Sequence, residues 1–198
     1  MTSSGSDKTV ALAILASGSG SNAEAIIKRF QNHPSIKVKL VLSNKPDAYV
    51  LQRAGQLDVP SMVFSRDEFY NSDCVVNLLK DMKIDWVILA GFLWLVPENL
   101  LKAYPDKIIN IHPALLPKYG GKGMYGMKVH QAVIAAKEKQ SGITIHLLND
   151  KYDEGPTLFQ AHVDIDEHDT PETLAQKIHA LEHKHFPAVI EQAILNKR

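Results

Sequence analysis

Asn110 and His112 are residue types that perform catalysis, and they end an apolar run, directly before a proline. Side chains two residues apart on an extended chain face the same way, so these two are expected to point together. An amide can stabilise an oxyanion, and an imidazole can move a proton near neutral pH. Asp153 is a candidate carboxylate partner that would orient the imidazole. No serine or cysteine is placed as an obvious nucleophile, so the substrate would supply its own; the alternative is a structural histidine.

The glycine-rich segment at residues 17–22, Ser-Gly-Ser-Gly-Ser-Asn, is a second candidate site. Glycines let the backbone turn tightly and approach a ligand, and the free N–H groups of a following helix attract anions. The segment therefore predicts a site for phosphate or another anion, with a tight turn capped by Ser and Asn as the alternative. It also fits G-x-G-x-x-A, but a dinucleotide fold needs an acidic residue about 20 positions on. The chain has Ser43 and Asn44 there.

Two patterns could in principle hold a metal. His179, Glu182 and His183 match an inverted zinc-protease motif on a helix. That motif needs a third ligand and arises easily by chance, so we expect no metal. The acidic residues at 164, 166, 167 and 169 do not fit an EF-hand and indicate a solvated face.

Three single residues receive structural interpretations or none. Cys74, the only cysteine, rules out a disulfide framework, and its apolar neighbours predict a buried small side chain. His146 alternates with apolar residues, which favours a core or supporting histidine over a catalytic one. His130 precedes an apolar-faced stretch and stays unassigned.

Composition excludes several classes of protein. The 198 residues are 45% hydrophobic, and 22 basic residues balance 22 acidic ones. Zero net charge provides no general attraction to nucleic acid or an anionic membrane. The longest apolar run, residues 86–96, is too short to span a bilayer. Residues 1–8 read as a disordered lead-in without an apolar signal, so we expect a cytoplasmic protein.

Apolar runs that alternate with helical patterns must position these side chains. The expected strands are residues 10–16, 38–42, 61–64, 86–90 and 107–111. The expected helices are residues 22–30, 47–56 with Asp47 as cap, one helix following the third strand through residue 82, and one that starts near Pro97. This alternation predicts a parallel sheet covered on both faces, with ligands beyond the carboxyl ends of its strands.

The pattern changes after about residue 140. Strand-like runs at residues 142–148 and 157–165 are joined by a connection short enough for a hairpin. Thr170 and Pro171 start a final helix that extends to about residue 195, with Pro187 as a potential point of disturbance. We therefore predict one α/β domain over residues 9–198. It would have a Rossmann-like, mostly parallel sheet with helices on both faces and an antiparallel C-terminal extension.

Several motifs together resemble one known family. They are the segments at 17–22, Ser-Asn-Lys at 43–45, Ser-Arg at 65–66, Leu-Ala-Gly-Phe at 89–92, Asn-Ile-His-Pro-Ala-Leu-Leu-Pro-Lys-Tyr at 110–119, Gly-Ile-Thr-Ile-His at 142–146, Asp-Glu-Gly-Pro at 153–156 and Glu-His-Lys-His-Phe-Pro at 182–187. The chain resembles the glycinamide ribonucleotide formyltransferases, purine-pathway enzymes that use 10-formyltetrahydrofolate. Folate-dependent formyl transferases in general share Asn-x-His-Pro with Leu-Leu-Pro. The early Gly-Ser-Asn loop and the late Glu-His pair narrow the resemblance to the enzymes that act on glycinamide ribonucleotide.

The resemblance implies three groups of site residues. Those that bind the substrate, the first three at its phosphate, are Gly20, Ser21, Asn22 and Glu182. Those around the formyl group are Asn110, His112 and Asp153. Those at the folate are Arg66, Leu93, Trp94, Leu95, Val96 and Asn110. The implied reaction is direct attack of the substrate amine on the formyl carbon. Asn110 would donate to the developing oxyanion, and protonated His112 would donate too or relay a proton.

The resemblance has two departures and leaves rivals. Many members have Met-Arg where this chain has Leu93 and Trp94, and the loop at 120–127 is longer than in several relatives. The implied partners are glycinamide ribonucleotide and formyl-folate, with no nucleic acid, membrane or metal, in a monomer or homodimer. Three other functions remain as alternatives. One is a methionyl-tRNA formyltransferase, which usually has a further basic domain, and another is a formyltetrahydrofolate hydrolase, which usually has an extra regulatory domain. The third is a dinucleotide-binding module.

Overall fold

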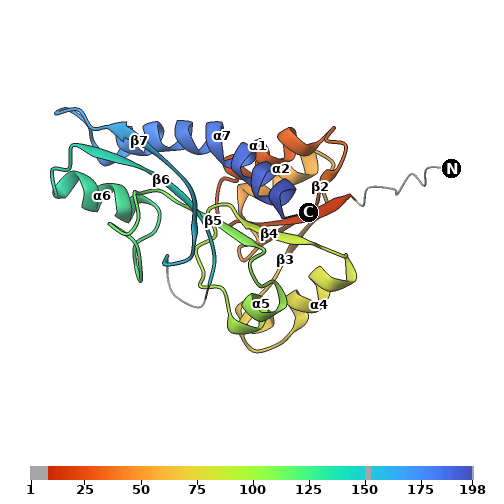
Figure 1. The fold of residues 1–198 in the computed structure, drawn as a ribbon. Helices are drawn as coiled ribbons and strands as arrows, with labels where there is room; N and C mark the ends of the chain where they lie inside the picture. Colours follow the sequence, from red (N-terminus) through yellow and green to blue (C-terminus); the bar gives the residue numbers. More distant parts are fainter. Residues whose placement is uncertain (1–8, 150–152, 198) are drawn as a thin grey trace.

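The structure, a computed structural model, describes residues 9–149 and 153–197, and this part of the chain is built on one sheet (Figure 1). Its strands are β1 (Val10–Leu15), β2 (Ile36–Ser43), β3 (Ser61–Val63), β4 (Trp86–Leu89), β5 (Ile108–His112), β6 (Gln140–Leu147) and β7 (Thr157–Asp164). Their order across the sheet is β3-β2-β1-β4-β5-β6-β7. Pairs among β1 to β5 are parallel, whereas β6 and β7 are added antiparallel. The predicted sheet is confirmed; the predicted lead-in at residues 1–8 lies outside the described residues.

Helices cover both faces of the sheet. They are α1 (Ser21–Phe30), α2 (Tyr49–Gln56), α3 (Arg66–Tyr70), α4 (Cys74–Asp81), α5 (Glu98–Ala103), α6 (Met127–Ala135) and α7 (Pro171–Asn196). Figure 1 shows α1, α2 and α7 on one side and α4 and α5 on the other. Alternate residues of β1 face opposite layers, so Leu12 and Ile14 join the α1 and α7 layer, while Ala13 and Leu15 join the α4 and α5 layer.

The single helix predicted after the third strand is wrong. Two helices, α3 and α4, form instead, because Ser72 offers the backbone other hydrogen bonds. Its hydroxyl donates to the Glu68 carbonyl and accepts from the Cys74 N–H group. The predicted burial of Cys74 is also wrong: it begins α4 on the exposed side, while Val75 and Leu79 fill the buried face.

The details of two other helices also differ from prediction. Asp47 does not cap α2, whose N-cap is Ala48 without a side-chain bond. A carbonyl from the glycine loop replaces that cap, because Gly18 accepts from the Val50 N–H group. Pro187 does not interrupt α7, which is continuous over 26 residues. Packing of apolar residues such as Phe186 into the core offsets the backbone hydrogen bond that proline removes.

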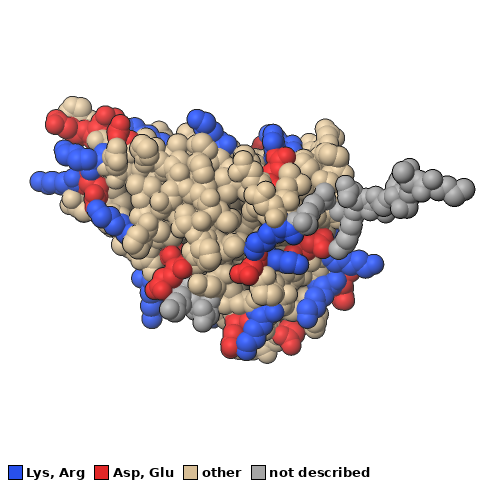
Figure 2. Space-filling view, viewed as in Figure 1, with Lys and Arg blue, Asp and Glu red and all other residues tan. Residues whose placement is uncertain are grey.

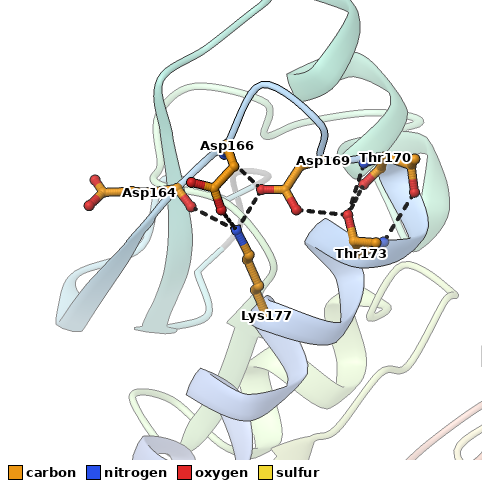
Figure 3. Close-up of polar contacts among 6 residues, drawn as sticks. All are labelled: Asp164, Asp166, Asp169, Thr170, Thr173 and Lys177. Carbon is orange, nitrogen blue, oxygen red and sulfur yellow. Dashed lines mark hydrogen bonds and ion pairs between the residues drawn. The ribbon is translucent and has the colours of Figure 1, made fainter.

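The acidic segment before α7 anchors that helix. The Lys177 ammonium lies 2.6 Å from one carboxylate oxygen of Asp166 and 2.6 Å from one of Asp169, two contacts that Figure 3 draws as dashed lines. The hydrogen bond from Lys177 is the main cause that lowers the pKa of Asp169 to about 2. Thr170 and Thr173 form a reciprocal capping box at the start of α7. The predicted solvated face holds for exposed Asp166 and is wrong for Asp169, whose side chain is mostly buried.

The surface matches the balanced composition. On the face shown in Figure 2, basic and acidic side chains are interspersed around a broad uncharged area. Within the described residues, no helix combines the length and the apolar character that crossing a bilayer requires.

Candidate active site

A cavity of about 970 Å³ lies where the parallel strands β1, β4 and β5 end. Its lining comes from residues 18–22, 89–98, 110–113 and 121–127, with Tyr70, Leu101, His130, Leu148, Asn149, Asp153, His179 and Glu182. Every residue that the resemblance implies, except Arg66, lines this cavity. The structure therefore brings the two candidate sites of the sequence together at the expected edge of the sheet.

His112, the last residue of β5, faces an oxygen at each ring nitrogen. Its Nε2 is 2.7 Å from the Tyr119 carbonyl oxygen, so this nitrogen carries a proton and donates it. Its Nδ1 is 3.8 Å from an Asp153 carboxylate oxygen. That separation suits an ion pair but exceeds a hydrogen bond, which leaves Nδ1 free to donate to a substrate oxygen when the ring is cationic.

Asn110 is oriented by His146, which lies opposite it on the antiparallel strand β6. The buried His146 ring donates from Nδ1 to the Leu147 carbonyl, so its Nε2 accepts from the Asn110 amide at 3.1 Å. Burial is the main cause that lowers the pKa of His146, which keeps the ring neutral and able to accept. His146 thus has the supporting position that its alternation predicted, and the Asn110 amide nitrogen is fixed by it.

Asp153 reaches the same point from the connection between β6 and β7. Its backbone is left-handed, with φ of 53°. One carboxylate oxygen accepts from the Gly121 N–H group at 2.8 Å, and the other lies 3.6 Å from His146 Nε2. A glycine of the 120–127 loop therefore holds the carboxylate, a contact that local sequence patterns could not indicate because the two segments are far apart in the chain.

The glycine loop ends where α1 begins. Gly20 is the N-cap, with φ of 75°, and a Cβ atom there would lie 2.4 Å from the Val50 side chain. Only glycine fits this position. Since glycine has no side chain to cap the helix, it leaves the N–H groups of the first turn to a ligand, which is the geometry of an anion site.

Glu182 of α7 forms the wall next to this loop. The residue is 5% exposed, and its carboxylate accepts from the Asn22 amide and from His179 Nδ1, both at 2.8 Å. The hydrogen bond to Glu182 raises the pKa of His179. The Asn22 amide oxygen is buried and finds no partner among the described residues, which leaves it an open acceptor in the cavity wall.

The opposite end of the cavity is apolar and aromatic. Leu93 and Leu95 expose their side chains there, while Trp94 packs partly into the core beneath. The Arg66 guanidinium lies outside the cavity lining, 4.8 Å from the Tyr70 ring centre and 5.6 Å from that of Trp94. Its cation therefore rests on two aromatic rings at the rim.

Comparison with known proteins identifies the family. A model of the family described as "Formyl transferase" matches residues 10–190. The chain belongs to the formyl transferase family. It is therefore a transferase, and this membership decides against the alternative of a dinucleotide-binding module.

Several relatives of this formyl transferase are named phosphoribosylglycinamide formyltransferase. Phosphoribosylglycinamide formyltransferase of Bacillus subtilis is 39% identical over 192 residues, which cover 94% of this chain and 96% of the relative. The protein of the same name from Haemophilus influenzae is 35% identical over 91% of this chain and 85% of its own. The crystal structure of phosphoribosylglycinamide formyltransferase from Bacillus halodurans superimposes with a TM-score of 0.84, at 38% identity over 95% of this chain and 97% of that one.

The residues of the possible zinc motif, His179, Glu182 and His183, contact protein side chains in this structure. Glu182 turns inward to Asn22, while the rings of His179 and His183 stack with centres 6.3 Å apart. Within residues 9–149 and 153–197, no group of three histidine, cysteine or acidic side chains is arranged to hold a metal ion.

Proposed function

We propose that this formyl transferase moves the formyl group of 10-formyltetrahydrofolate to the amine of 5′-phosphoribosylglycinamide. One observation carries the proposal: Asn110, His112 and Asp153 meet in a cavity between a helix N-terminus and an apolar, aromatic wall. The names of the Bacillus and Haemophilus relatives support the same reaction.

The glycine loop suits the phosphate end of the acceptor substrate. Backbone N–H groups at Gly20, Ser21 and Asn22 would bind phosphate oxygens at the positive end of α1. Glu182, fixed by two hydrogen bonds, would accept from hydroxyl or N–H groups farther along the same molecule. These contacts would put the phosphate and the amine at different points of one cavity.

The apolar end suits the folate, whose bound form supplies an activated formyl group. The segment Leu93, Trp94, Leu95 and Val96 would contact the flat rings, and Asn110 would lie against the formyl group. Arg66, held over Tyr70 and Trp94, offers a cation to an acidic tail.

The proposed mechanism needs no protein nucleophile. The substrate amine attacks the formyl carbon, and Asn110 donates to the oxygen on which negative charge develops. Such a donor contributes about 10²–10³ in rate. His112, as a cation beside Asp153, gives its Nδ1 proton to the folate nitrogen as the bond from that nitrogen to the formyl carbon breaks, and it then takes a proton from the attacking amine, which contributes about 10²–10⁴. The proton lost by the amine balances the proton gained by that nitrogen.

Formyl transfer from a 10-formylfolate analogue, followed by folate absorbance, tests the function. We expect turnover that requires 5′-phosphoribosylglycinamide. Turnover in its absence would indicate a hydrolase, and no turnover by folded protein would refute the proposal.

A further inference from the structure

His130 of α6 is a buried polar residue without an assigned task. Its side chain is 3% exposed and lines the cavity, and its Nδ1 atom has no hydrogen-bond partner within the described residues. Buried polar atoms of native proteins nearly always have a partner, so an exception in a cavity wall points to a group that arrives with a ligand.

The surroundings of His130 keep its ring neutral. Burial is the main cause that lowers its pKa, and the nearby His179 and His112 lower it further, while Glu182 of α7 acts in the opposite direction. A neutral imidazole has one donor and one acceptor nitrogen. Because an orphaned buried N–H group is the rarer arrangement, the proton belongs on Nε2, and Nδ1 is then an unused acceptor.

The electrostatic neighbours of His130 place its ring between two parts of the cavity wall. His179 and Glu182 belong to the wall beside the glycine loop, and His112 belongs to the group at the end of β5. His130 therefore lies close enough to interact electrostatically with the wall beside the glycine loop and with the group at the end of β5. A substrate that extends from the glycine loop to His112 passes this part of the wall.

We propose that His130 is a further substrate-binding residue, whose Nδ1 accepts a hydrogen bond from an amide or amine N–H group of the acceptor substrate between Glu182 and His112. The inference rests on the proposed function. It adds α6 to the elements that bind the part of the substrate beyond its phosphate, where Glu182 of α7 is the other proposed contact.

Three substitutions of His130 distinguish the contribution of Nδ1 to acceptor binding from that of Nε2. His130→Leu removes both, His130→Asn keeps a polar atom near the Nδ1 position, and His130→Gln keeps one near Nε2. Binding of 5′-phosphoribosylglycinamide is measured by calorimetry, with KM for both substrates and thermal unfolding of the free protein. His168→Leu, at an exposed position away from the cavity, is the matched control.

We expect His130→Leu to raise Kd and KM for the acceptor about 2- to 10-fold, the range of one neutral hydrogen bond, without changing KM for the folate donor. The asparagine variant should retain more affinity than the glutamine variant. The Tm of free His130→Leu should be unchanged or higher, because an unpartnered buried atom is removed.

Two results would overturn the inference while leaving the proposed function in place. One is unchanged acceptor binding by His130→Leu, and the other is better retention of affinity by the glutamine variant than by the asparagine variant. A fall in Tm with unchanged Kd would show a structural role instead. Failure of the unmodified protein to bind the acceptor at all would refute the proposed function itself, and this inference with it.

Discussion

Replacement of Asp153 by asparagine tests the proposed ion pair with the least disturbance. The new amide would keep the shape of the side chain and an oxygen that accepts from the Gly121 N–H group. It would lose the negative charge, which lies 3.8 Å from His112 Nδ1 and 3.6 Å from the Nε2 atom of the neutral His146 ring. The substitution therefore removes the stabilisation of a cationic His112 and spares the loop contact.

The size of the effect follows from the distance. Two unit charges at 3.8 Å attract by about 1 kcal/mol in bulk water and about 4 kcal/mol at the effective dielectric of a protein surface. The side chains of His112 and Asp153 are 5% and 16% exposed, so the larger figure is the better guide. If His112 acts as a cation in the transition state, kcat should fall roughly 5- to 1,000-fold.

Steady-state kinetics of Asp153→Asn, with both substrates varied, measures this effect. We expect most of the loss in kcat and little in either KM, because the charge acts on the reacting group. Asp81→Asn changes an exposed carboxylate outside the cavity and should leave kcat unaltered. A folded Asp153→Asn protein with kcat within twofold of the parent would show that this charge does not stabilise the transition state.

Three further changes probe other parts of the site. Gly20→Ala forces a Cβ into Val50 at positive φ, so unfolding free energy should fall by about 2–5 kcal/mol in chemical denaturation, whereas Gly18→Ala, with open space around it, should not share the loss. The raised pKa of His179 means that its pair with Glu182 stabilises the fold fully below the unfolded value near 6.5 and loses this effect as pH rises through the folded pKa. The stability difference between the parent and His179→Leu should therefore be larger at about pH 6 than at about pH 9. Trp94→Ala removes one ring beneath Arg66 and should raise KM for the folate donor about 2- to 10-fold, with KM for the acceptor unchanged.

Each of these predictions has a contrary result. Equal denaturation midpoints for the two glycine variants would refute the steric argument at residue 20. If the stability difference between the parent and His179→Leu were the same at both pH values, protonation of His179 would not contribute to stability. A higher KM for the acceptor in Trp94→Ala would show that the indole contributes to binding of the acceptor and not only of the folate.

Local pattern predicted part of the site, whereas Glu182, Arg66 and residues 93–96 were implied only by the resemblance to a known family. The two-residue spacing correctly indicated that Asn110 and His112 face one cavity, since it depends only on an extended chain. The part that holds Asn110 in place could not be predicted, because its partner His146 is set by the register between β5 and β6. Nothing in a single sequence specifies that register before the strands pair.

Contacts between distant segments account for the other gaps. Glu182 contacts Asn22, which is 160 positions away in the sequence. The role of Glu182 in the inverted zinc motif therefore depends on how α7 packs against α1, which the local pattern does not indicate. The helix break at Ser72 depends on side-chain bonds that compete with a continuous apolar pattern, and the pattern does not indicate which would prevail.

The most direct test of the proposed reaction follows the formyl carbon itself. Protein is mixed with 10-formyltetrahydrofolate labelled with ¹³C in the formyl group and with 5′-phosphoribosylglycinamide, and the products are identified by mass spectrometry. We expect the label to appear on the amine of the nucleotide as deformylated folate forms in equal amount. Label recovered as free formate, or retained on the folate by folded protein, would contradict the proposed transfer.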